Sequence, residues 1–332
     1  MFIKTLINDL ISVFKPEIYH GFAKKKSFFE GWYFKITDKT KSKTFVFIPG
    51  ISKYTNDRHS FIQFFHNGQL KREYFRFPIE SFKSEFNTFE INIENNIFST
   101  DHLEFNLLSD NKTINGSLRL SNLNRWKVTP LNPGIMGFFG IIPFMECYYD
   151  LIAAKGTVNG SLSIDGESTD FNGGSVYIEK NWGKSFPTEW IWIQGNNFDN
   201  DNTGFTFSYA TIPFGLLHFN GLTAGLFYKN KIIKFATYNL TRVIKLNVYD
   251  NKIEIVLKKG KLYLELNAVS NDTASLPYPT PNGMNGTINE SVTGTINLKI
   301  SKKNGKSFRT IFQGQSSNCG IEIGGFRNIN KE

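Results

Sequence analysis

The feature that most constrains the fold is a succession of short β-branched and aromatic segments, each bounded by glycine, asparagine, aspartate or serine. Such segments are typical of strands, and Asn67-Gly68 and Asn115-Gly116 are typical turn pairs between them. The predicted strands are 32–36, 44–48, 61–65, 89–93, 103–107, 114–120, 190–194, 204–210, 222–228, 231–236, 252–257, 261–266 and 294–300. Strands do not alternate with helices, so the pattern argues against a Rossmann-type fold and predicts antiparallel barrels or sandwiches.

The length of the chain predicts two domains. Single hydrophobic cores stop growing at roughly 250–300 residues, and this chain has 332 residues, of which 40% are hydrophobic. We expect an N-terminal helix and arm over residues 1–24, one β-domain over 25–172 and a second over 173–328. The boundary between the two domains is placed near Asn172, before Tyr177.

The first residues have the periodicity of an amphipathic helix. Apolar side chains recur on one helical face over residues 2–14, and Pro16 ends the segment. We expect this helix to pack on the body of the protein; the alternative is an interfacial helix that contacts a bilayer. No secretory signal and no apolar stretch of roughly 20 residues is found. We therefore expect a cytoplasmic protein, and the interfacial-helix alternative would add peripheral contact with a membrane.

Charge and metal-binding residues exclude several classes of function. The formal net charge is +9, but the basic residues are scattered and form no recognition helix or zinc-finger spacing. Nucleic acid is therefore not an expected partner, and a weak attraction to anionic lipid fits the charge better. The two cysteines form no CxxC motif, and no two of the five histidines have metal-ligand spacing. No metal site is predicted.

Two segments interrupt the strand pattern. Residues 133–144 read PGIMGFFGIIPF and carry no charge. We interpret them as a loop or short helix over an apolar opening, or else as packing buried between domains. Residues 275–284 contain three prolines and predict a long loop.

Four stretches carry a family resemblance. They are FFEGWYF at 28–34, residues 137–148 ending in PFMECY, residues 177–194 with YIEKNWG, FP and WIWIQ, and the tail at 316–325. In this order they resemble the tocopherol cyclase family, which is related to carotenoid 1,2-hydratases and AttH-type proteins. The resemblance runs from about residue 20 to residue 326, and the order of the motifs makes it specific.

The resemblance implies a fold and an activity. The fold would be a pair of lipocalin-like β-domains, and the activity would be closure of a chroman ring on a prenylated hydroquinone. The implied partner is a hydrophobic small molecule, and no metal or redox cofactor is expected. Two alternatives are an isoprenoid hydratase and a carrier without chemistry. One departure is Tyr149, which stands where related bacterial sequences often carry histidine.

Ring closure of this kind needs a protonated acid aimed at an alkene. A carboxyl in an apolar pocket has a raised pKa and stays protonated near neutral pH. Glu146, which follows an apolar run, is the first candidate, and Glu179 and Glu30 follow. Asp150 and Asp170 lie in less apolar sequence. Each glutamate has a structural alternative, because a buried carboxylate often only ties strands together.

Aromatic and polar residues of the same motifs are candidates for binding the substrate. Aromatic faces stabilise a carbocation through their quadrupole, and polar groups bind ring oxygens. The candidates are Trp32, Tyr33, Tyr148, Lys180, Asn181, Trp182, Trp190, Trp192 and Gln194. Their alternatives are plain core for the aromatic residues and, for Lys180 and Asn181, partners of Glu30 or Glu146.

Overall fold

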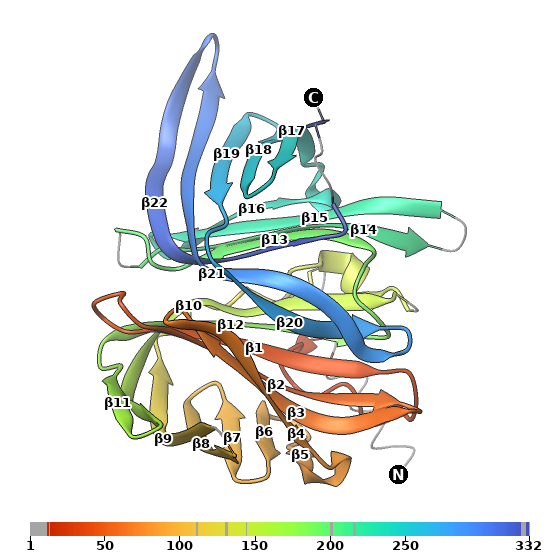
Figure 1. The fold of residues 1–332 in the computed structure, drawn as a ribbon. Coiled ribbons are helices and arrows are strands. Elements are labelled where there is room, and N and C mark those ends of the chain that lie inside the picture. Colours follow the sequence, from red (N-terminus) through yellow and green to blue (C-terminus); the bar gives the residue numbers. More distant parts are fainter. Residues whose placement is uncertain are drawn as a thin grey trace. The chain divides into compact units, whose positions relative to one another are not determined.

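The structure of this chain is a computed structural model that describes residues 12, 14–110, 112–129, 132–143, 145–199, 202–214, 217–326 and 330–331. It is built almost entirely from antiparallel strands, and it divides into two compact units (Figure 1). Unit 1 comprises residues 1–186 and 276–287, and unit 2 comprises residues 187–275 and 288–332. The prediction of an all-β chain with two lipocalin-like domains is confirmed.

Unit 1 contains one sheet with the strand order β4-β3-β2-β1-β12-β10-β9-β8-β7-β6-β5, and β11 pairs with β10. The strands are β1 (Phe29–Thr37), β2 (Thr44–Tyr54), β3 (Asp57–His66), β4 (Gln69–Phe77), β5 (Phe82–Ser84), β6 (Glu90–Ile93), β7 (Asn96–Ser99), β8 (His102–Ser109), β9 (Lys112–Ser121), β10 (Cys147–Ile164), β11 (Glu167–Asp170) and β12 (Gly174–Gly183). The short 3₁₀ helices are η1 (Ile79–Ser81) and η2 (Gly137–Ile141).

The order of these strands makes the sheet of unit 1 curl. The two ends of the path, β4 and β5, are joined only by Pro78 and η1, so they must lie near each other. The first strand, β1, pairs with the last, β12. The concave face encloses an aromatic core in which Trp32 and Phe34 of β1 have no exposed surface.

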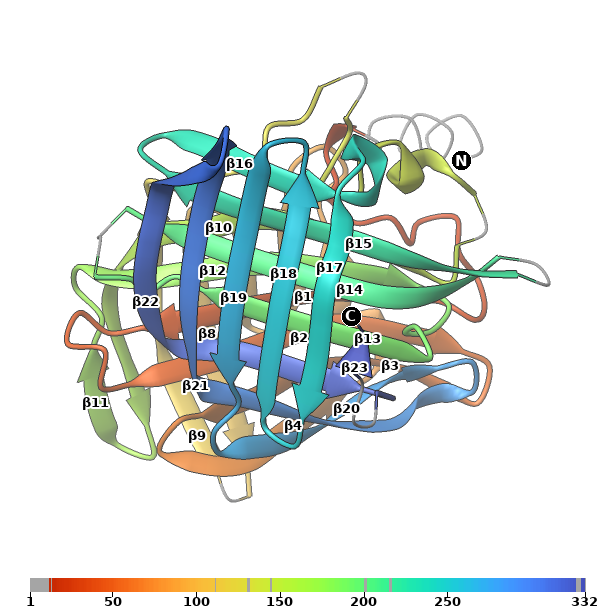
Figure 2. The ribbon, with the colours of Figure 1, turned by 90° about the horizontal axis from the view of Figure 1, so that it is seen from above.

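Unit 2 repeats the arrangement with the order β16-β15-β14-β13-β22-β21-β19-β18-β17-β23, and β20 pairs with β21. The strands are β13 (Glu189–Gly195), β14 (Gly204–Phe214), β15 (Leu217–Tyr228), β16 (Lys231–Ala236), β17 (Arg242–Tyr249), β18 (Lys252–Lys259), β19 (Leu262–Val269), β20 (Thr273–Thr280), β21 (Gly283–Asn304), β22 (Ser307–Gly324) and β23 (Asn330–Lys331). The helix η3 (Thr237–Asn239) joins β16 to β17. Figure 2 shows β17, β18 and β19 side by side, as their pairing requires.

Each unit therefore starts with a four-stranded meander and pairs its first strand with a strand from its end, β1 with β12 and β13 with β22. In unit 2 the core is aliphatic and aromatic, with Ile191 and Ile193 of β13 pointing into it. Alternation places Trp190, Trp192 and Gln194 on the opposite face of that strand.

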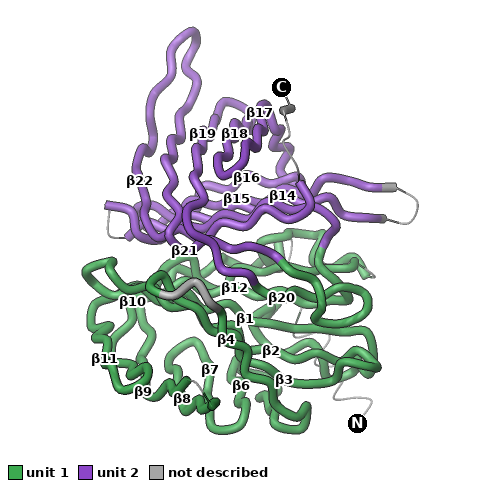
Figure 3. Tube along the Cα trace, viewed as in Figure 1, with its two compact units in different colours: residues 1–186, 276–287 green, residues 187–275, 288–332 purple. Residues whose placement is uncertain are grey.

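The proline-rich segment 275–284 is a β-hairpin, so the prediction of a long loop was wrong. Strand β20 contains Pro277 and Pro279 and pairs only with β21, and an edge strand tolerates proline because its free side needs no backbone donor. The tip of the hairpin groups with unit 1 (Figure 3). There the backbone N–H of Met284 donates to Asp57, and that of Phe186 donates to Pro279.

The two units divide after Phe186, whereas the sequence placed the boundary near Asn172. The physical reason is strand β12, which follows Asn172 and pairs with both β1 and β10 of unit 1. The helix predicted for residues 2–14 lies outside the described residues, except for Ser12 and Phe14. In the described part of the chain, no helix has the length and apolar character needed to cross a membrane.

The core of unit 1 can be tested at Phe34. Its ring is fully buried and packs against Phe89 and Phe98, with ring centroids 6.2 Å and 5.6 Å away. We expect Phe34→Ala to lower the free energy of unfolding by about 3–5 kcal/mol, because it leaves a cavity. Urea denaturation measures this. The control is Leu108→Ala, at a side chain that is 76% exposed; an equal loss in the control would contradict the assignment of the core.

Candidate functional site

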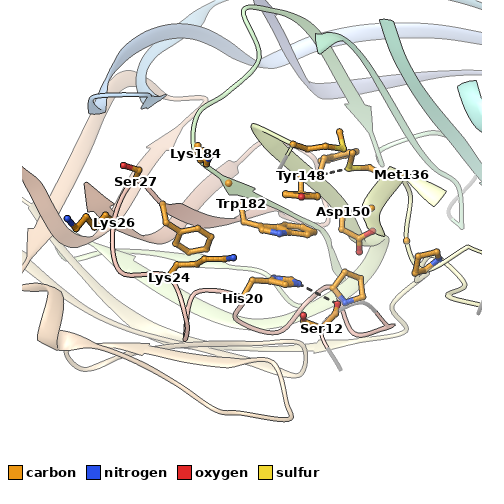
Figure 4. A pocket seen from close by; sticks show the side chains of 18 residues that line it. Ser12, His20, Lys24, Lys26, Ser27, Met136, Tyr148, Asp150, Trp182 and Lys184 are labelled. Carbon is orange, nitrogen blue, oxygen red and sulfur yellow. Dashed lines mark hydrogen bonds between the residues drawn. The ribbon is translucent and has the colours of Figure 1, made fainter. Parts of the chain in front are cut away.

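A cavity of about 280 Å³ lies within unit 1, beside the start of β10 and the end of β12 (Figure 4). Its walls come from the arm before β1, the segment between β9 and β10, and these two strands. The lining residues are Ser12, Pro16, His20, Lys24, Lys26, Ser27, Phe28, Pro133, Gly134, Met136, Gly140, Met145, Tyr148, Tyr149, Asp150, Trp182, Gly183 and Lys184.

Strand register explains why the polar groups of the cavity gather there. In the β10–β12 pair, Tyr148 lies opposite Trp182 and Asp150 lies opposite Lys180. Directly opposed residues of antiparallel strands point to the same face of the sheet. The uncharged segment 133–143 includes η2 and lines the same cavity through Pro133, Gly134, Met136 and Gly140. This agrees with its interpretation as a segment over an apolar opening.

Lys180 fastens the N-terminal arm to strand β12. Its side chain has no exposed surface, and its Nζ atom lies 2.5 Å from Glu30 Oε1. The same ammonium donates to the backbone carbonyl oxygens of Pro16, at 2.8 Å, and Ile18. Trp32 Nε1 donates to the carbonyl oxygen of Glu17 at 3.0 Å and adds a further tie. The arm is thus held across the sheet by buried hydrogen bonds.

Glu30 is the negative half of this buried ion pair. Burial alone would raise the pKa of its carboxyl, but the charge of Lys180 and the hydrogen bond from its ammonium hold the pKa below its ordinary value. The backbone N–H of His20 also donates to the Glu30 carboxylate at 3.0 Å. Burial lowers the pKa of Lys180, and Glu30 opposes that shift. Glu30 is therefore an ionised group with its partners in place.

His20 is neutral, and its tautomer follows from its neighbours. Burial and the Lys180 charge lower the pKa of the imidazole. Lys180 Nζ lies 2.6 Å from His20 Nδ1, and because an ammonium has no acceptor, Nδ1 accepts. The ring proton then sits on Nε2, which lies 3.4 Å from the Ser12 carbonyl oxygen. The 3.2 Å contact of Nδ1 with Glu30 is consequently not an ion pair.

Trp182 lies between two other rings. The His20 ring stacks on it with a centroid distance of 4.3 Å, and the Tyr148 ring with one of 5.4 Å. Figure 4 shows His20 and Tyr148 on opposite sides of Trp182. Lys180 Nζ lies 4.7 Å from the Trp182 ring centroid, which is within the range of a cation–π interaction. Tyr148 Oη donates to the carbonyl oxygen of Ile142 at 2.8 Å.

Asp150 is the carboxyl group of the cavity whose pKa is raised. It is 3% exposed, and burial raises the pKa of its carboxyl to about 7, against a partial opposing effect of the Ile135 backbone N–H. That N–H donates to Oδ1 at 2.9 Å. Burial therefore lets this carboxyl keep its proton to a higher pH than an ordinary aspartate does.

Two glycines leave room for this arrangement. A Cβ atom on Gly134 would lie 2.6 Å from Asp150 Oδ1. A Cβ atom on Gly183 would lie 2.2 Å from the Glu146 carbonyl oxygen, and Gly183 has a φ of +148°. That carbonyl also accepts the backbone N–H of Lys184 at 2.7 Å, so the turn after β12 depends on the glycine.

The other carboxylates predicted from the sequence lie elsewhere. Glu146 is half-buried and is not among the lining residues. Glu179 points to the other face of β12, where its carboxylate accepts the hydroxyl groups of Tyr177, at 2.5 Å, and Tyr149, at 3.1 Å. Tyr33 packs edge-to-face on Tyr177. Tyr149 is also one of the residues that line the cavity.

The remaining candidates divide between core and unit 2. Trp32 belongs to the core of unit 1, and Asn181 lies in register with Tyr149. Trp190, Trp192 and Gln194 lie on β13 of unit 2. There Trp190 Nε1 donates to Glu322 at 2.9 Å, and burial raises the pKa of the Glu322 carboxyl. None of these three residues is among those that line the cavity of unit 1.

Sequence reasoning did not select Asp150 or His20, which both line the cavity. Asp150 was placed below the glutamates because Tyr148, Tyr149 and Asp150 read as less apolar than the residues before Glu146. The available signal was its position two residues after Tyr148, since alternate strand residues share a face. His20 carried no such signal, because the arm that bears it is irregular.

Comparison with known proteins identifies the family. The sequence profile of the family described as "Tocopherol cyclase-like" matches residues 109–325. A protein of Oryza sativa subsp. japonica named "Probable tocopherol cyclase, chloroplastic" is 24% identical over 205 residues. The match covers 60% of this chain and 44% of the rice protein, so this chain spans less than half of that relative's length.

Two solved structures have the same fold. CghA with Sch210972 has a TM-score of 0.54 at 11% identity, covering 90% of this chain and 88% of that one. Kievitone hydratase from Nectria haematococca has a TM-score of 0.51 at 14% identity, covering 92% and 93%. At these identities the likeness shows the fold alone.

The buried ion pair can be tested by a double-mutant cycle. Lys180→Met leaves the Glu30 carboxylate buried without its partner, so we expect the free energy of unfolding to fall by about 3–5 kcal/mol. Adding Glu30→Gln should restore part of this loss, because it removes the uncompensated charge. The exposed pair Lys299–Glu265, 3.7 Å apart, is the control and should show little coupling. Equal coupling in the two pairs, measured by urea denaturation, would argue against a stabilising role of the Lys180–Glu30 pair.

Proposed function

The chain belongs to the tocopherol cyclase-like family, and we propose that it closes an oxygen-containing ring on a prenylated phenol or hydroquinone in the cavity of unit 1. The observation that carries this proposal is the carboxyl of Asp150, which is buried beside Tyr148, Met136 and Trp182 and whose pKa burial raises to about 7. The substrate class comes from the family, and the choice of acid comes from the geometry of the cavity.

Protonation of a trisubstituted alkene demands an acid that is present in its neutral form and screened from water. An aspartate with a pKa near 7 meets the first condition at neutral pH. Its 3% exposure and the apolar segment 133–143 meet the second. Glu30 is a poorer acid, because Lys180 and the backbone N–H of His20 stabilise its ionised form.

The proposed reaction conserves atoms and charge. The Asp150 hydroxyl transfers its proton to the less substituted alkene carbon, and the π electrons form the new C–H bond. The tertiary cation that results is captured by the phenol oxygen, which forms the C–O bond of the ring. The oxonium then returns its proton to the Asp150 carboxylate, so the acid is regenerated and the product is an isomer of the substrate.

The surroundings favour the cation without trapping it. The Asp150 carboxylate left by the first step is an anion next to the cation, and electrostatic attraction is strong in a site without water. The sulfur atoms of Met136 and Met145 and the ring of Tyr148 are polarisable and carry no reactive charge. The cavity volume of about 280 Å³ fits a ring and the first prenyl unit rather than a long chain.

The acid can be tested by isotope incorporation. We expect the protein to convert a prenylated hydroquinone in D₂O to a chroman with one carbon-bound deuterium, detected by mass spectrometry. Asp150→Asn should lower the rate by at least about 100-fold, which is the lower range for loss of a general acid. Asp170→Asn is the control, because that carboxylate is exposed on β11.

Other outcomes would assign a different acid or a different class of function to the protein. Full activity in Asp150→Asn with loss in Glu146→Gln would move the acid to Glu146. Incorporation of oxygen from ¹⁸O-labelled water into a tertiary alcohol would indicate a hydratase. Tight retention of an unchanged ligand by both the native protein and Asp150→Asn would indicate a carrier.

The pH dependence follows from the raised pKa. Because the acid must be protonated, we expect kcat/KM to be constant below about pH 7 and to fall tenfold per pH unit above it.

The free energy of unfolding should also depend on pH through the raised pKa of Asp150. The carboxyl titrates near 3.8 in the unfolded chain and near 7 in the folded one. Stability due to the neutral form is therefore fully present below pH 3.8 and is lost as pH rises to 7.

Asp150→Asn tests this linkage independently of substrate. The substitution keeps an acceptor for the Ile135 N–H but cannot ionise. We expect the variant to be more stable than the native protein at pH 8, by about 4 kcal/mol at most. Urea denaturation at pH 4 and pH 8 measures the difference. A native protein with equal stability at both pH values would rule out a raised Asp150 pKa.

A further inference from the structure

One end of the cavity is basic. Lys24, Lys26 and Lys184 line it, and all three side chains are exposed. In the described part of unit 1, the ion pairs are formed by other cations, and none of these three lysines takes part in one. Figure 4 shows the three lysines with Ser27 toward one end and Asp150 with Ser12 toward the other. In the same view, the Lys24 side chain extends toward Trp182 and His20.

The loop that bears two of these lysines is held in place. Lys53 Nζ donates to the carbonyl oxygens of Gly21, at 2.7 Å, and Lys24, at 3.1 Å. Arg58 Nη1 donates to the carbonyl oxygen of Lys25 at 2.9 Å. The backbone N–H of Lys24 donates to Gly21 at 3.1 Å. The anchoring groups are themselves cations on β2 and β3, so they add positive charge near the loop.

A neutral ligand would not interact strongly with the positive charge of the three lysines at the cavity mouth. Three ammonium groups at a cavity mouth repel one another, and the repulsion is relieved when an anion binds between them. Carboxylates and phosphates accept hydrogen bonds from lysine that are stronger than neutral ones. Charge complementarity therefore favours a ligand with an apolar reacting end near Asp150 and an anionic group at the mouth.

We propose that Lys24, Lys26 and Lys184 form an anion subsite, and that the prenylated aromatic substrate carries a carboxylate or phosphate group that this subsite binds. The inference rests on the proposed function of the cavity and narrows its substrate class from neutral hydroquinones to acidic phenols. Holding the anion at the mouth would fix which end of the substrate enters first, and so place the alkene at Asp150.

Binding of small probes tests the subsite without any turnover. We expect Asp150→Asn, which cannot act as the acid, to bind 4-hydroxybenzoate at least tenfold more tightly than hydroquinone, measured by calorimetry. Phenyl phosphate compared with phenol tests whether phosphate is also accepted. The preference should shrink as salt rises from 0.05 M to 0.5 M, because exposed charges are screened. Equal affinity for the acidic and neutral probes would overturn the proposal.

Lysine variants identify the groups that bind the anion. In the same background, Lys24→Gln/Lys26→Gln should abolish the preference for 4-hydroxybenzoate over hydroquinone. Lys25→Gln is the matched control, because Lys25 is also exposed on the same loop, does not line the cavity, and contributes only its backbone carbonyl to the anchoring. An equal loss in Lys25→Gln would show a general effect of charge and would overturn the subsite.

Two further arms separate the sources of the anion. If the lysines serve an anionic lipid surface instead, Lys24→Gln/Lys26→Gln should lose binding to vesicles of phosphatidylserine and phosphatidylcholine while probe affinities stay unchanged. That result would refute a small-molecule subsite.

Turnover separates this inference from the proposed function. If the native protein cyclises a neutral prenylated hydroquinone as fast as its ring-carboxylated analogue, the proposed function stands and this inference fails. If neither compound reacts but the acidic probe still binds selectively, the proposed reaction fails and the subsite stands.

Discussion

The buried pair of Lys180 and Glu30 is the interaction on which the rest of unit 1 depends. Both side chains have no exposed surface, and leaving either charge alone in such a place would be costly. The pair tolerates burial because backbone groups of the arm complete it, with Pro16 and Ile18 accepting from Lys180 and His20 donating to Glu30. Folding of the arm over the sheet and neutralisation of the pair are therefore one event, and that event closes one side of the cavity.

The same pair determines the chemistry of its neighbours. Lys180 places the His20 proton on Nε2 and orients the ring that stacks on Trp182, so two aromatic walls of the cavity are held by one ammonium group. Asp150 faces the opposite situation. Its N–H donor and the charge of Lys180 both lower its pKa, but burial outweighs them and raises the pKa of the carboxyl to about 7. Two carboxyl groups of unit 1 thus have pKa values shifted in opposite directions, which is the arrangement expected when one is structural and the other is an acid.

The two units share a strand order, but the side chains and segments around the central strands differ between them. In unit 1 the arm, the segment 133–143 and the β10–β12 pair surround a cavity that is acidic at one end and basic at the other. In unit 2 the corresponding pairing of β13 with β22 places Trp190 on Glu322, outside the core of that unit. The two units therefore repeat one arrangement of strands, and the segments attached to the first and last strands make their side-chain environments different.

The sequence by itself determined the all-β class, the two domains and the segment over the cavity. Alternating apolar and polar residues, turn pairs and an uncharged stretch are local properties that can be read from neighbouring residues. It also selected Glu30, Lys180, Trp182 and Tyr148 as important without showing which was structural. Only the tertiary structure decided that Lys180 belongs to Glu30, since the β1–β12 register and the path of an irregular arm bring them together. The pKa of Asp150 was decided in the same way, because burial is a property of everything packed around a carboxyl and not of the residues beside it in the chain.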